Sequence, residues 1–207
     1  MRITRVLITF FFVVTFGTSS LFAQVLATGE TGGKGNSAVF VSVNGLFPEG
    51  LTLFNAYGQY VYGVTDKVDV AVVYGNISAL GGTQNYVGFG WNATLLKRDR
   101  AFVDVSFFNV TTIPVHRRSE ASTILTTPAI IVSRPVTIKG KKAALYSGIN
   151  ATVPIGQVKG KLFTPPEVLW NVPAGFSTAL SEKWAVYIET DIGTNLNTFG
   201  VGFLKIF

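Results

Sequence analysis

Apolar and polar residues alternate with a period of two over most of the chain after residue 36. Between residues 84 and 96, for example, Val87, Phe89 and Trp91 alternate with Gly90 and Asn92. This period predicts β-strands, and no helical period competes with it. Turn residues divide the pattern into ten segments, each about as long as a tilted strand that crosses a bilayer. They are 37–46, 51–63, 68–79, 84–96, 101–112, 127–138, 142–153, 168–180, 184–194 and 197–207.

The connections between these segments alternate between two kinds. Tight charged turns lie at 65–67, 97–100, 139–142 and 181–183. Longer and more variable connections lie at 47–50, 81–83, 112–126 and 154–167. Short turns at one end, longer loops at the other and an even number of strands are typical of an outer-membrane barrel whose two termini lie in the periplasm.

The alternation alone leaves open which face of the sheet meets water. A soluble sandwich or barrel would bury its apolar face, whereas a membrane barrel would turn that face outward to lipid. The polar face favours the membrane barrel, because it is rich in glycine and poor in Lys and Glu, which suits a crowded lumen. We therefore predict an all-β fold, a single antiparallel transmembrane β-barrel of about ten strands over 37–207, with eight strands as the alternative.

Aromatic residues on the apolar face predict a girdle at the membrane interfaces. Its members are Tyr60, Tyr62, Trp91, Trp170 and Trp184. The alternative is that these rings form the core of a sandwich.

The first 23 residues predict a secretory signal peptide. Arg2 and Arg5 precede an apolar run of ten residues, and small residues follow before Gln24. The apolar run is too short to span a bilayer as a helix. We expect 24–36 to be a flexible tail. Removing Arg2 and Arg5, with no acidic residue in the segment, lowers the formal net charge from +6 to +4.

The composition narrows the function classes further. Basic residues are scattered, without a basic helix or an aromatic-interleaved patch, so nucleic acid is not an expected partner. The chain contains no cysteine, and an exported chain of this size without disulfides suits a bacterial envelope protein. With 48% hydrophobic residues but no run of 18 uncharged apolar residues after the signal, the sequence excludes helical membrane spans.

The sixth segment fits the pattern least well. Arg134 shares a parity with apolar residues, so we expect either that it turns inward or that the register of 127–138 is wrong. Pro135 removes a donor from the strand ladder, and a bulge is the usual way to accommodate it. Asp104 and Arg134 are candidates for an ion pair inside the barrel. Lys205 also shares the apolar parity, but it lies near a rim, where a charge costs little.

Two hairpins and the C-terminus resemble Gram-negative outer-membrane β-barrels. A strand runs into a short turn of hydroxyl, acidic and basic residues at 62–72 and again at 180–186. The C-terminal aromatic Phe207, with Phe203 and Val201 before it, resembles the signal that the barrel-assembly machinery recognises in that class; Lys205 departs from its pattern. The resemblance implies a barrel in the outer membrane of a Gram-negative bacterium, in contact with lipid and lipopolysaccharide, and does not indicate a solute.

Candidate chemistry is sparse. The only histidine is His116, so no metal set or Cys/His pair is available, and we expect neither catalysis nor a cofactor. His116, Arg117 and Arg118 form a basic cluster in the predicted outer loop, suited to lipopolysaccharide phosphates or simply to solvent. The predicted lumen carries polar side chains, namely Asn55, Tyr57, Gln59, Asp69, Asn92, Asp104, Ser106, Asn150, Glu189 and Asp191.

These features leave three functional hypotheses. The first is a narrow channel or small-solute uptake barrel, mildly cation-selective through its acidic lumen. The second is a structural or surface-interaction barrel with a plugged lumen, because ten strands enclose little space. The third is a soluble, exported, lipocalin-like binder.

Overall fold

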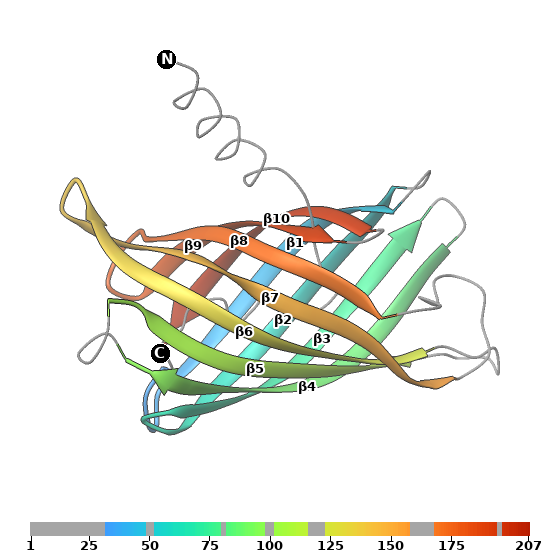
Figure 1. Cartoon of the computed structure of the whole chain (residues 1–207), viewed down its shortest axis with the longest axis horizontal. Coiled ribbons are helices and arrows are strands. Elements are labelled where there is room, and N and C mark those ends of the chain that lie inside the picture. The colour runs from blue at the N-terminus through green and yellow to red at the C-terminus, as the bar shows by residue number, and fades with distance from the viewer. Residues whose placement is uncertain are drawn as a thin grey trace, which may run out of the picture.

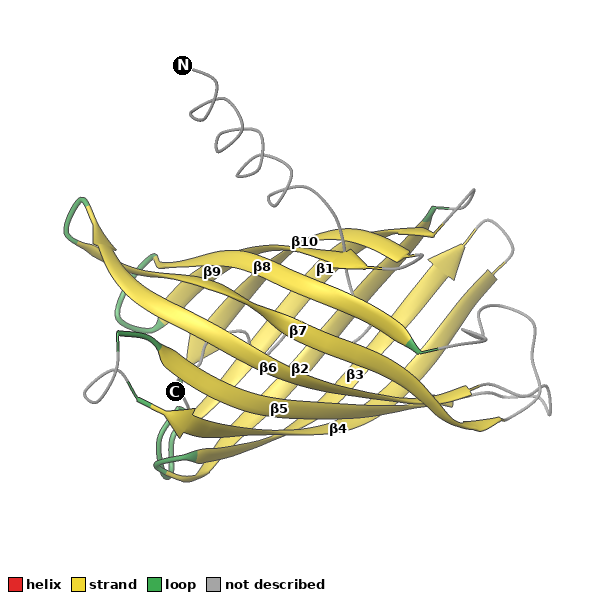
Figure 2. Cartoon of the chain, in the orientation of Figure 1, coloured by secondary structure: helices red, strands yellow, loops and turns green. Residues whose placement is uncertain are grey.

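Ten strands form one closed antiparallel barrel (Figures 1 and 2). The computed structural model describes residues 32–48, 52–79, 82–97, 102–115, 123–157, 168–193 and 196–207. The strands are β1 (Ser37–Pro48), β2 (Leu53–Thr65), β3 (Val68–Ala79), β4 (Gly82–Leu96), β5 (Asp104–Val115), β6 (Thr123–Ile138), β7 (Lys141–Gln157), β8 (Leu169–Ala179), β9 (Trp184–Gly193) and β10 (Leu196–Ile206). The predicted ten-strand barrel is confirmed, and the alternative of eight strands is wrong.

Closure depends on the pairing of the first and last strands. Each strand pairs with its neighbour in sequence, and β1 pairs with β10 from Ala38–Ile206 to Pro48–Leu196. The amide of Phe207 also donates to the carbonyl of Ser37 at 3.0 Å. Closure leaves no sheet edge with unsatisfied backbone groups, which is a requirement for a β-structure in hydrocarbon. Within the described residues, no helix is long and apolar enough to cross a membrane.

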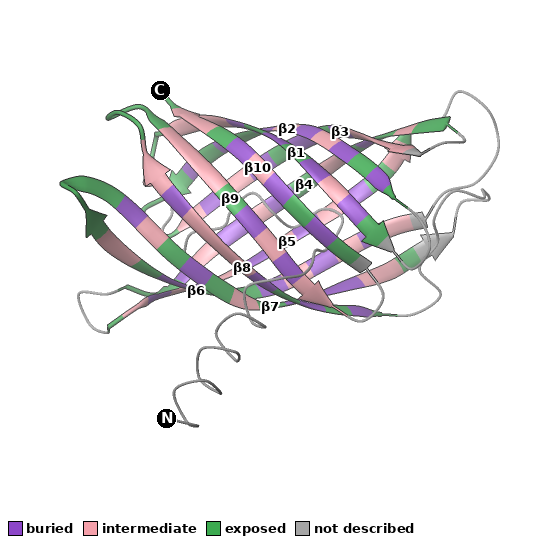
Figure 3. Cartoon of the chain, turned by 90° about the horizontal axis from the view of Figure 1, so that it is seen from above, coloured by how far each residue is buried: buried purple, intermediate pink, exposed green. Residues whose placement is uncertain are grey.

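The inner and outer faces follow the predicted alternation. Figure 3 shows buried positions alternating with half-buried or exposed ones along most of the strands. On β1, Val41 and Val43 face outward with 50% and 61% of their surface exposed, while Ser42 and Asn44 face inward with 6% and 2% exposed. The apolar face therefore points away from the barrel axis, and the polar residues are enclosed. This arrangement is the reverse of a soluble lipocalin-like binder, so that hypothesis is wrong.

The strands β5, β6 and β7 run further than predicted. β5 continues to Val115, β6 begins at Thr123 and β7 continues to Gln157, so the loops expected at 112–126 and 154–167 are shorter. Threonines stabilise this extension, because the Thr111 hydroxyl donates to Thr126 Oγ1 at 3.1 Å and Thr126 donates to Asn109 Oδ1 at 2.9 Å. Hydroxyl pairs of this kind across strands stabilise a sheet.

The sixth strand corrects three expectations. Arg134 faces outward in an unbroken register, with its guanidinium carbon 3.6 Å from the ring centre of Phe102. Asp104 is buried on the inner face, so the two side chains do not form the expected internal ion pair. No bulge lies at Pro135; pairing between β5 and β6 ends at Asp104–Ser133, so the proline lies where β6 has lost its partner on that side.

The two ends of the barrel differ. The tight turns after β2, β6 and β8 lie at the same end as Ser37 and Phe207, and we call this the turn end. The other end, reached by Pro48 and Gln157, is the loop end. Both described ends of the chain therefore lie at the turn end. The orientation of this end toward the periplasm stays a prediction.

Candidate functional site

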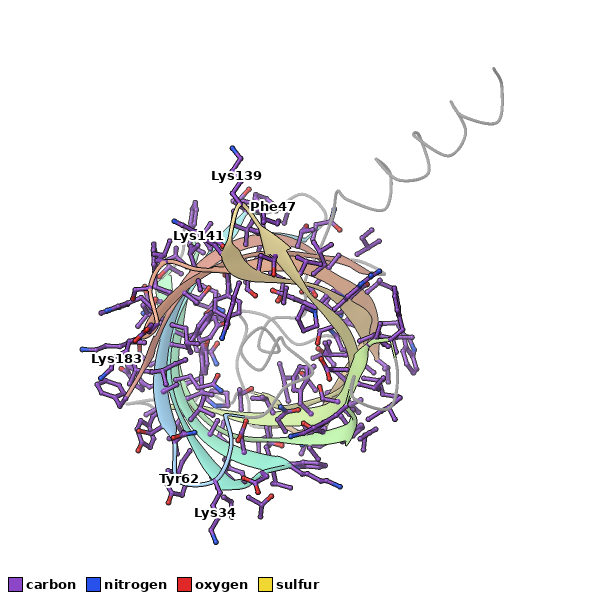
Figure 4. All side chains as sticks on the ribbon, turned by 90° about the vertical axis from the view of Figure 1, so that its left-hand side faces the viewer. Lys34, Phe47, Tyr62, Lys139, Lys141 and Lys183 are labelled. Atoms are coloured by element: carbon purple, nitrogen blue, oxygen red, sulfur yellow. The ribbon has the colours of Figure 1, made fainter. Side chains whose placement is uncertain are left out.

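The inner face of the barrel collects the polar residues that the sequence placed there. All ten predicted lumen residues are buried, with 6% exposure or less. Four of them carry carboxylates: Asp69, Asp104, Glu189 and Asp191. The lysines and Arg134 in the described ranges are partly or fully exposed. Figure 4 views the barrel from the turn end and shows Lys34, Lys139, Lys141 and Lys183 pointing away from it. The described inner face therefore carries acidic side chains and no basic one.

The lumen is not polar throughout. Large apolar side chains are also buried on the inner face, where the prediction had placed only polar residues and glycines. They are Phe40, Leu46, Leu53, Val61, Val73, Phe108, Val110, Leu125, Ile131 and Leu169. Several belong to strands β3, β5 and β6. Burial of these side chains shows that the ten-strand barrel is filled over much of its cross-section, as expected for an interior only slightly wider than that of an eight-strand barrel.

Glu189 is held by a tyrosine from two strands away. Gly175 on β8 pairs in register with both Tyr146 on β7 and Glu189 on β9. Because Gly175 has no side chain, the ring of Tyr146 lies across it, where a Cβ atom would overlap the ring. The Tyr146 hydroxyl then donates to Glu189 Oε2 at 2.6 Å. This short hydrogen bond fixes one oxygen of the Glu189 carboxyl group.

The same arrangement occurs a second time in the barrel. Gly75 on β3 pairs with both Tyr57 on β2 and Tyr86 on β4. The ring of Tyr86 covers Gly75, and its hydroxyl donates to Asn55 Oδ1 at 2.9 Å. Tyr86 and Tyr146 were missing from the predicted lumen residues. The available signal was a tyrosine on the polar parity with a glycine opposite on the next strand.

Amide and hydroxyl side chains also line the inner face on the strands near Glu189. Ser42 donates to Asn44 Oδ1 at 2.8 Å, and Asn171 donates to Asn150 Oδ1 at 3.1 Å. Gln59 on β2 is 2% exposed, and neither its amide nitrogen nor its oxygen has a hydrogen-bond partner. An unpartnered buried amide is costly, and it favours a polar ligand.

Residues 32–36, which we placed in the tail, form a turn against the inner face at the turn end. We call this segment the mouth turn. Gly33 and Gly35 both have φ of 82°, a conformation that favours glycine. The Gly32 amide donates to Asp69 Oδ2 at 2.9 Å, and the Gly35 amide donates to the carbonyl of Gly63 at 2.8 Å. Residues 24–31 lie outside the described ranges, as does the predicted signal peptide.

Removing the Asp69 carboxylate is expected to loosen the mouth turn. In Asp69→Ala the Gly32 amide loses its acceptor, worth about 1 kcal/mol, so its hydrogen exchange should become about five- to tenfold faster. Asp66→Ala is the control. Asp66 accepts an exposed hydrogen bond from the Lys34 amide at 3.3 Å, and losing that bond should change the exchange of the Gly32 amide much less. Exchange measured by NMR would contradict the assignment if both variants behaved alike.

The outer face has an apolar band, with Tyr62, Trp170 and Trp184 near strand ends and Trp91 near the middle of β4. Tyr60, Tyr62, Trp170 and Trp184 are between 43% and 54% exposed, and Trp91 is half-buried against Phe107, with 5.2 Å between ring centres. A continuous exposed apolar band around a closed barrel requires lipid as its surroundings. The fold is that of a transmembrane β-barrel.

The C-terminal residues lie on the lipid-facing side of this barrel. Phe203 and Phe207 are 46% and 59% exposed, and Val201 is half-buried on the same face. The Lys205 ammonium lies 5.2 Å from the ring centre of Trp184 and 4.9 Å from that of Phe207, a cation–π arrangement at the turn end. The basic cluster of His116, Arg117 and Arg118 lies outside the described residues.

One pocket of about 450 Å³ lies on the outer wall of the barrel and not in the lumen. Its floor includes Ala56 and Gly58 on β2, and its sides include Val41 and Val43 on β1 and Tyr74 on β3. Small residues on one strand between larger ones on its neighbours explain the hollow. Among the described residues, no group of three or more His, Cys, Asp or Glu side chains could hold a metal ion.

Comparison with known proteins gives distant structural similarities only. No family model matches the sequence, and no curated protein matches it. The barrel is similar to an outer membrane channel from Pseudomonas putida F1 (TM-score 0.46, 10% identity, 86% of this chain and 97% of that one). It is also similar to the KdgM porin (TM-score 0.44, 10% identity, 81% of this chain and 98% of that one). A third similarity is to the N-terminal β-barrel domain of Pseudomonas aeruginosa OprF (TM-score 0.40, 13% identity, 84% of this chain and 99% of that one).

Proposed function

We propose that this protein is a barrel of the Gram-negative outer membrane that admits small cationic solutes into an acidic lumen, as a narrow channel or uptake barrel. One observation carries the proposal: the described inner face holds Asp69, Asp104, Glu189 and Asp191 and no basic side chain. Enclosing a carboxylate is costly unless hydrogen bonds, water or a cation meet it. Rings of acidic side chains in a narrow lumen favour cations and repel anions.

Ion selectivity in planar bilayers tests this proposal. The double substitution Glu189→Gln and Asp191→Asn keeps the size of both side chains and removes two charges. We expect the K⁺/Cl⁻ permeability ratio to fall at least about fivefold, since one carboxylate near a cation contributes about 1 kcal/mol even in water. The measurement is the reversal potential in a KCl gradient.

Glu182 supplies the matched control for charge. It lies in the exposed turn between β8 and β9, and Glu182→Gln removes a carboxylate from the turn end without touching the lumen. Its permeability ratio should equal that of the unmodified protein. A ratio that falls equally in both variants would assign selectivity to surface charge and contradict the proposal.

A second function is favoured by the filling of the lumen. Leu46, Leu53 and Phe108 are at most 1% exposed on the inner face. A barrel plugged by its own side chains would serve as a structural or surface-interaction protein, acting through the connections between β5 and β6 and between β7 and β8. Complete absence of single-channel current from correctly folded protein would favour this function over the first.

The external partners follow from the outward orientation of the apolar face. We propose that outer-membrane lipid covers the apolar band, and that lipopolysaccharide phosphates meet His116, Arg117 and Arg118 if these residues face outward. The outward position of Val201, Phe203 and Phe207 supports recognition of the C-terminal strand by the barrel-assembly machinery. We propose no enzymatic role.

A further inference from the structure

The lumen has two chemically different walls. Glu189 and Asp191 lie on β9, whereas β4 is five strands away in a closed barrel of ten and therefore lies directly across the lumen. Tyr187 on β9, Asn171 on β8 and Thr198 on β10 add polar groups on this side, while the strands around β4 bury Val73, Phe108 and Val110 together with the polar Asp69, Asn92 and Thr112. The carboxylates therefore face a wall that is apolar at Val73, Phe108 and Val110.

The strand register fixes which residues lie opposite Glu189. The row of paired residues through Glu189 reaches β4 at Gln84 when followed through β10, β1, β2 and β3. Followed the other way, through β8, β7, β6 and β5, it reaches β4 beside Leu96. Strands in a barrel are tilted, so the row climbs on one side and descends on the other. The point on β4 at the height of Glu189 is midway between the two, at Gly90.

Small and apolar residues surround this point. Gly90 pairs with Ala71 on β3 and with Val110 on β5. Two positions along β4, Gly88 pairs with Val73 and lies at the height of Asp191. No side chain projects from the two glycines. Their partners are Ala71, Val73 and Val110, which are hydrocarbon, and Thr112, which pairs with Gly88 on β5 and carries a hydroxyl. A ligand whose cationic end binds the carboxylates would contact this wall with its opposite end.

Aromatic rings lie on the carboxylate side. Phe40 on β1 packs edge-on against Tyr187 on β9, with 5.5 Å between ring centres, and lies 5.9 Å from the ring centre of Tyr57. Carboxylates next to aromatic rings recognise organic ammonium groups, because both attract the cation while the rings also contact its carbon atoms. An inorganic cation needs a full set of oxygen ligands instead.

An independent observation also points to a ligand here. The buried amide of Gln59 on β2 has no partner for either polar atom, and β2 lies between the two walls. We propose that the lumen at the height of Glu189 is a binding site for primary alkylammonium ions, with the ammonium group at Glu189 and Asp191 and the alkyl chain against Val73 and Val110. The inference rests on the proposed function, whose cationic solute it specifies.

Equilibrium binding to the purified full-length barrel in detergent tests the site without requiring conduction. The probes are methylammonium, butylammonium and butanol. Each methylene buried against the apolar wall should tighten binding by up to about fourfold, so butylammonium should bind at least about tenfold more tightly than methylammonium. Glu189→Gln should weaken butylammonium at least about tenfold and leave butanol unchanged.

Two valine substitutions test the apolar wall. Val73→Thr with Val110→Thr keeps the shape of both side chains and makes them polar, so the preference for butylammonium should fall below about threefold. Val72→Thr is the control, since Val72 is 59% exposed on the outer face of the same strand and should leave the preference unchanged. Heat-modifiable gel mobility verifies that each variant is folded.

Two results would overturn the inference. Equal affinity for methylammonium and butylammonium would show that the apolar wall does not contribute to binding. Equal affinity for butanol and butylammonium would show that the carboxylates do not contribute. Either result alongside an intact K⁺/Cl⁻ selectivity would remove the alkylammonium site and leave the proposed function standing. If the unmodified protein shows no K⁺/Cl⁻ selectivity but still prefers butylammonium to methylammonium, the alkylammonium site stands and the channel function is removed.

Discussion

Replacing Val43 by arginine is expected to lower the free energy of unfolding by about 2 to 4 kcal/mol. Val43 lies near the middle of β1, pairs with Val201 on β10 and has 61% of its surface exposed on the outer face. If that face meets lipid tails, the guanidinium must be desolvated or must distort the bilayer. Reversible urea unfolding in lipid vesicles, monitored by tryptophan fluorescence, measures the change.

The same substitution near a rim provides the control. Ile138 is the last residue of β6 before the turn and is 47% exposed. Ile138→Arg should cost only about 0 to 1 kcal/mol, because an arginine near the interface reaches water and headgroups. Arg134 already lies outward in this part of β6, with its guanidinium over Phe102. Equal and small costs at both positions would mean that water, not lipid, surrounds the barrel.

The fold follows from the sequence because its determinants are local. A period of two defines each strand, and turn residues at short intervals define their number. Val41 and Val43 against Ser42 and Asn44 already separate the two faces of β1. The polar parity is rich in glycine and poor in Lys and Glu, which indicates that this parity is enclosed. Each of these signals is contained within about ten neighbouring residues.

The sixth strand shows where local reasoning stops. Whether Pro135 needs a bulge depends on where β5 begins, and β5 begins at Asp104, which pairs with Ser133. Whether Arg134 is tolerated depends on its distance from the rim and on Phe102, which lies before β5. Neither fact is encoded in the residues next to position 135.

The site was predictable only in part for the same reason. The alternation placed Glu189 and Asp191 on the inner face, but it gave no register between strands. The contact of Tyr146 with Glu189 joins strands β7 and β9 over 43 residues of sequence and requires a glycine on the strand between them. The opposition of the carboxylates and the apolar wall likewise depends on closure of the barrel, which a single strand does not reveal.

Substituting Gly175 by alanine is expected to lower the free energy of unfolding by about 1 to 3 kcal/mol. A Cβ atom at position 175 would overlap the ring of Tyr146, so the ring must move and its hydroxyl must leave Glu189. This cost includes both the overpacking and the loss of the buried hydrogen bond from Tyr146 to Glu189. Urea unfolding in vesicles again gives the magnitude, and the K⁺/Cl⁻ permeability ratio reports whether the released carboxylate still acts on ions.

Gly58→Ala is the matched control for Gly175→Ala, because a Cβ at Gly58 would find its nearest atoms at 3.9 and 4.0 Å on the outer face. Alanine there should leave stability unchanged or raise it by up to about 1 kcal/mol, since glycine in a strand loses more conformational freedom on folding. A double-mutant cycle identifies the cause: in a Tyr146→Ala background, Gly175→Ala should cost little, because the ring it displaces is gone. Additive costs in that cycle would contradict this cause. They would show that the backbone of β8 requires glycine at position 175 for a reason unrelated to the ring of Tyr146.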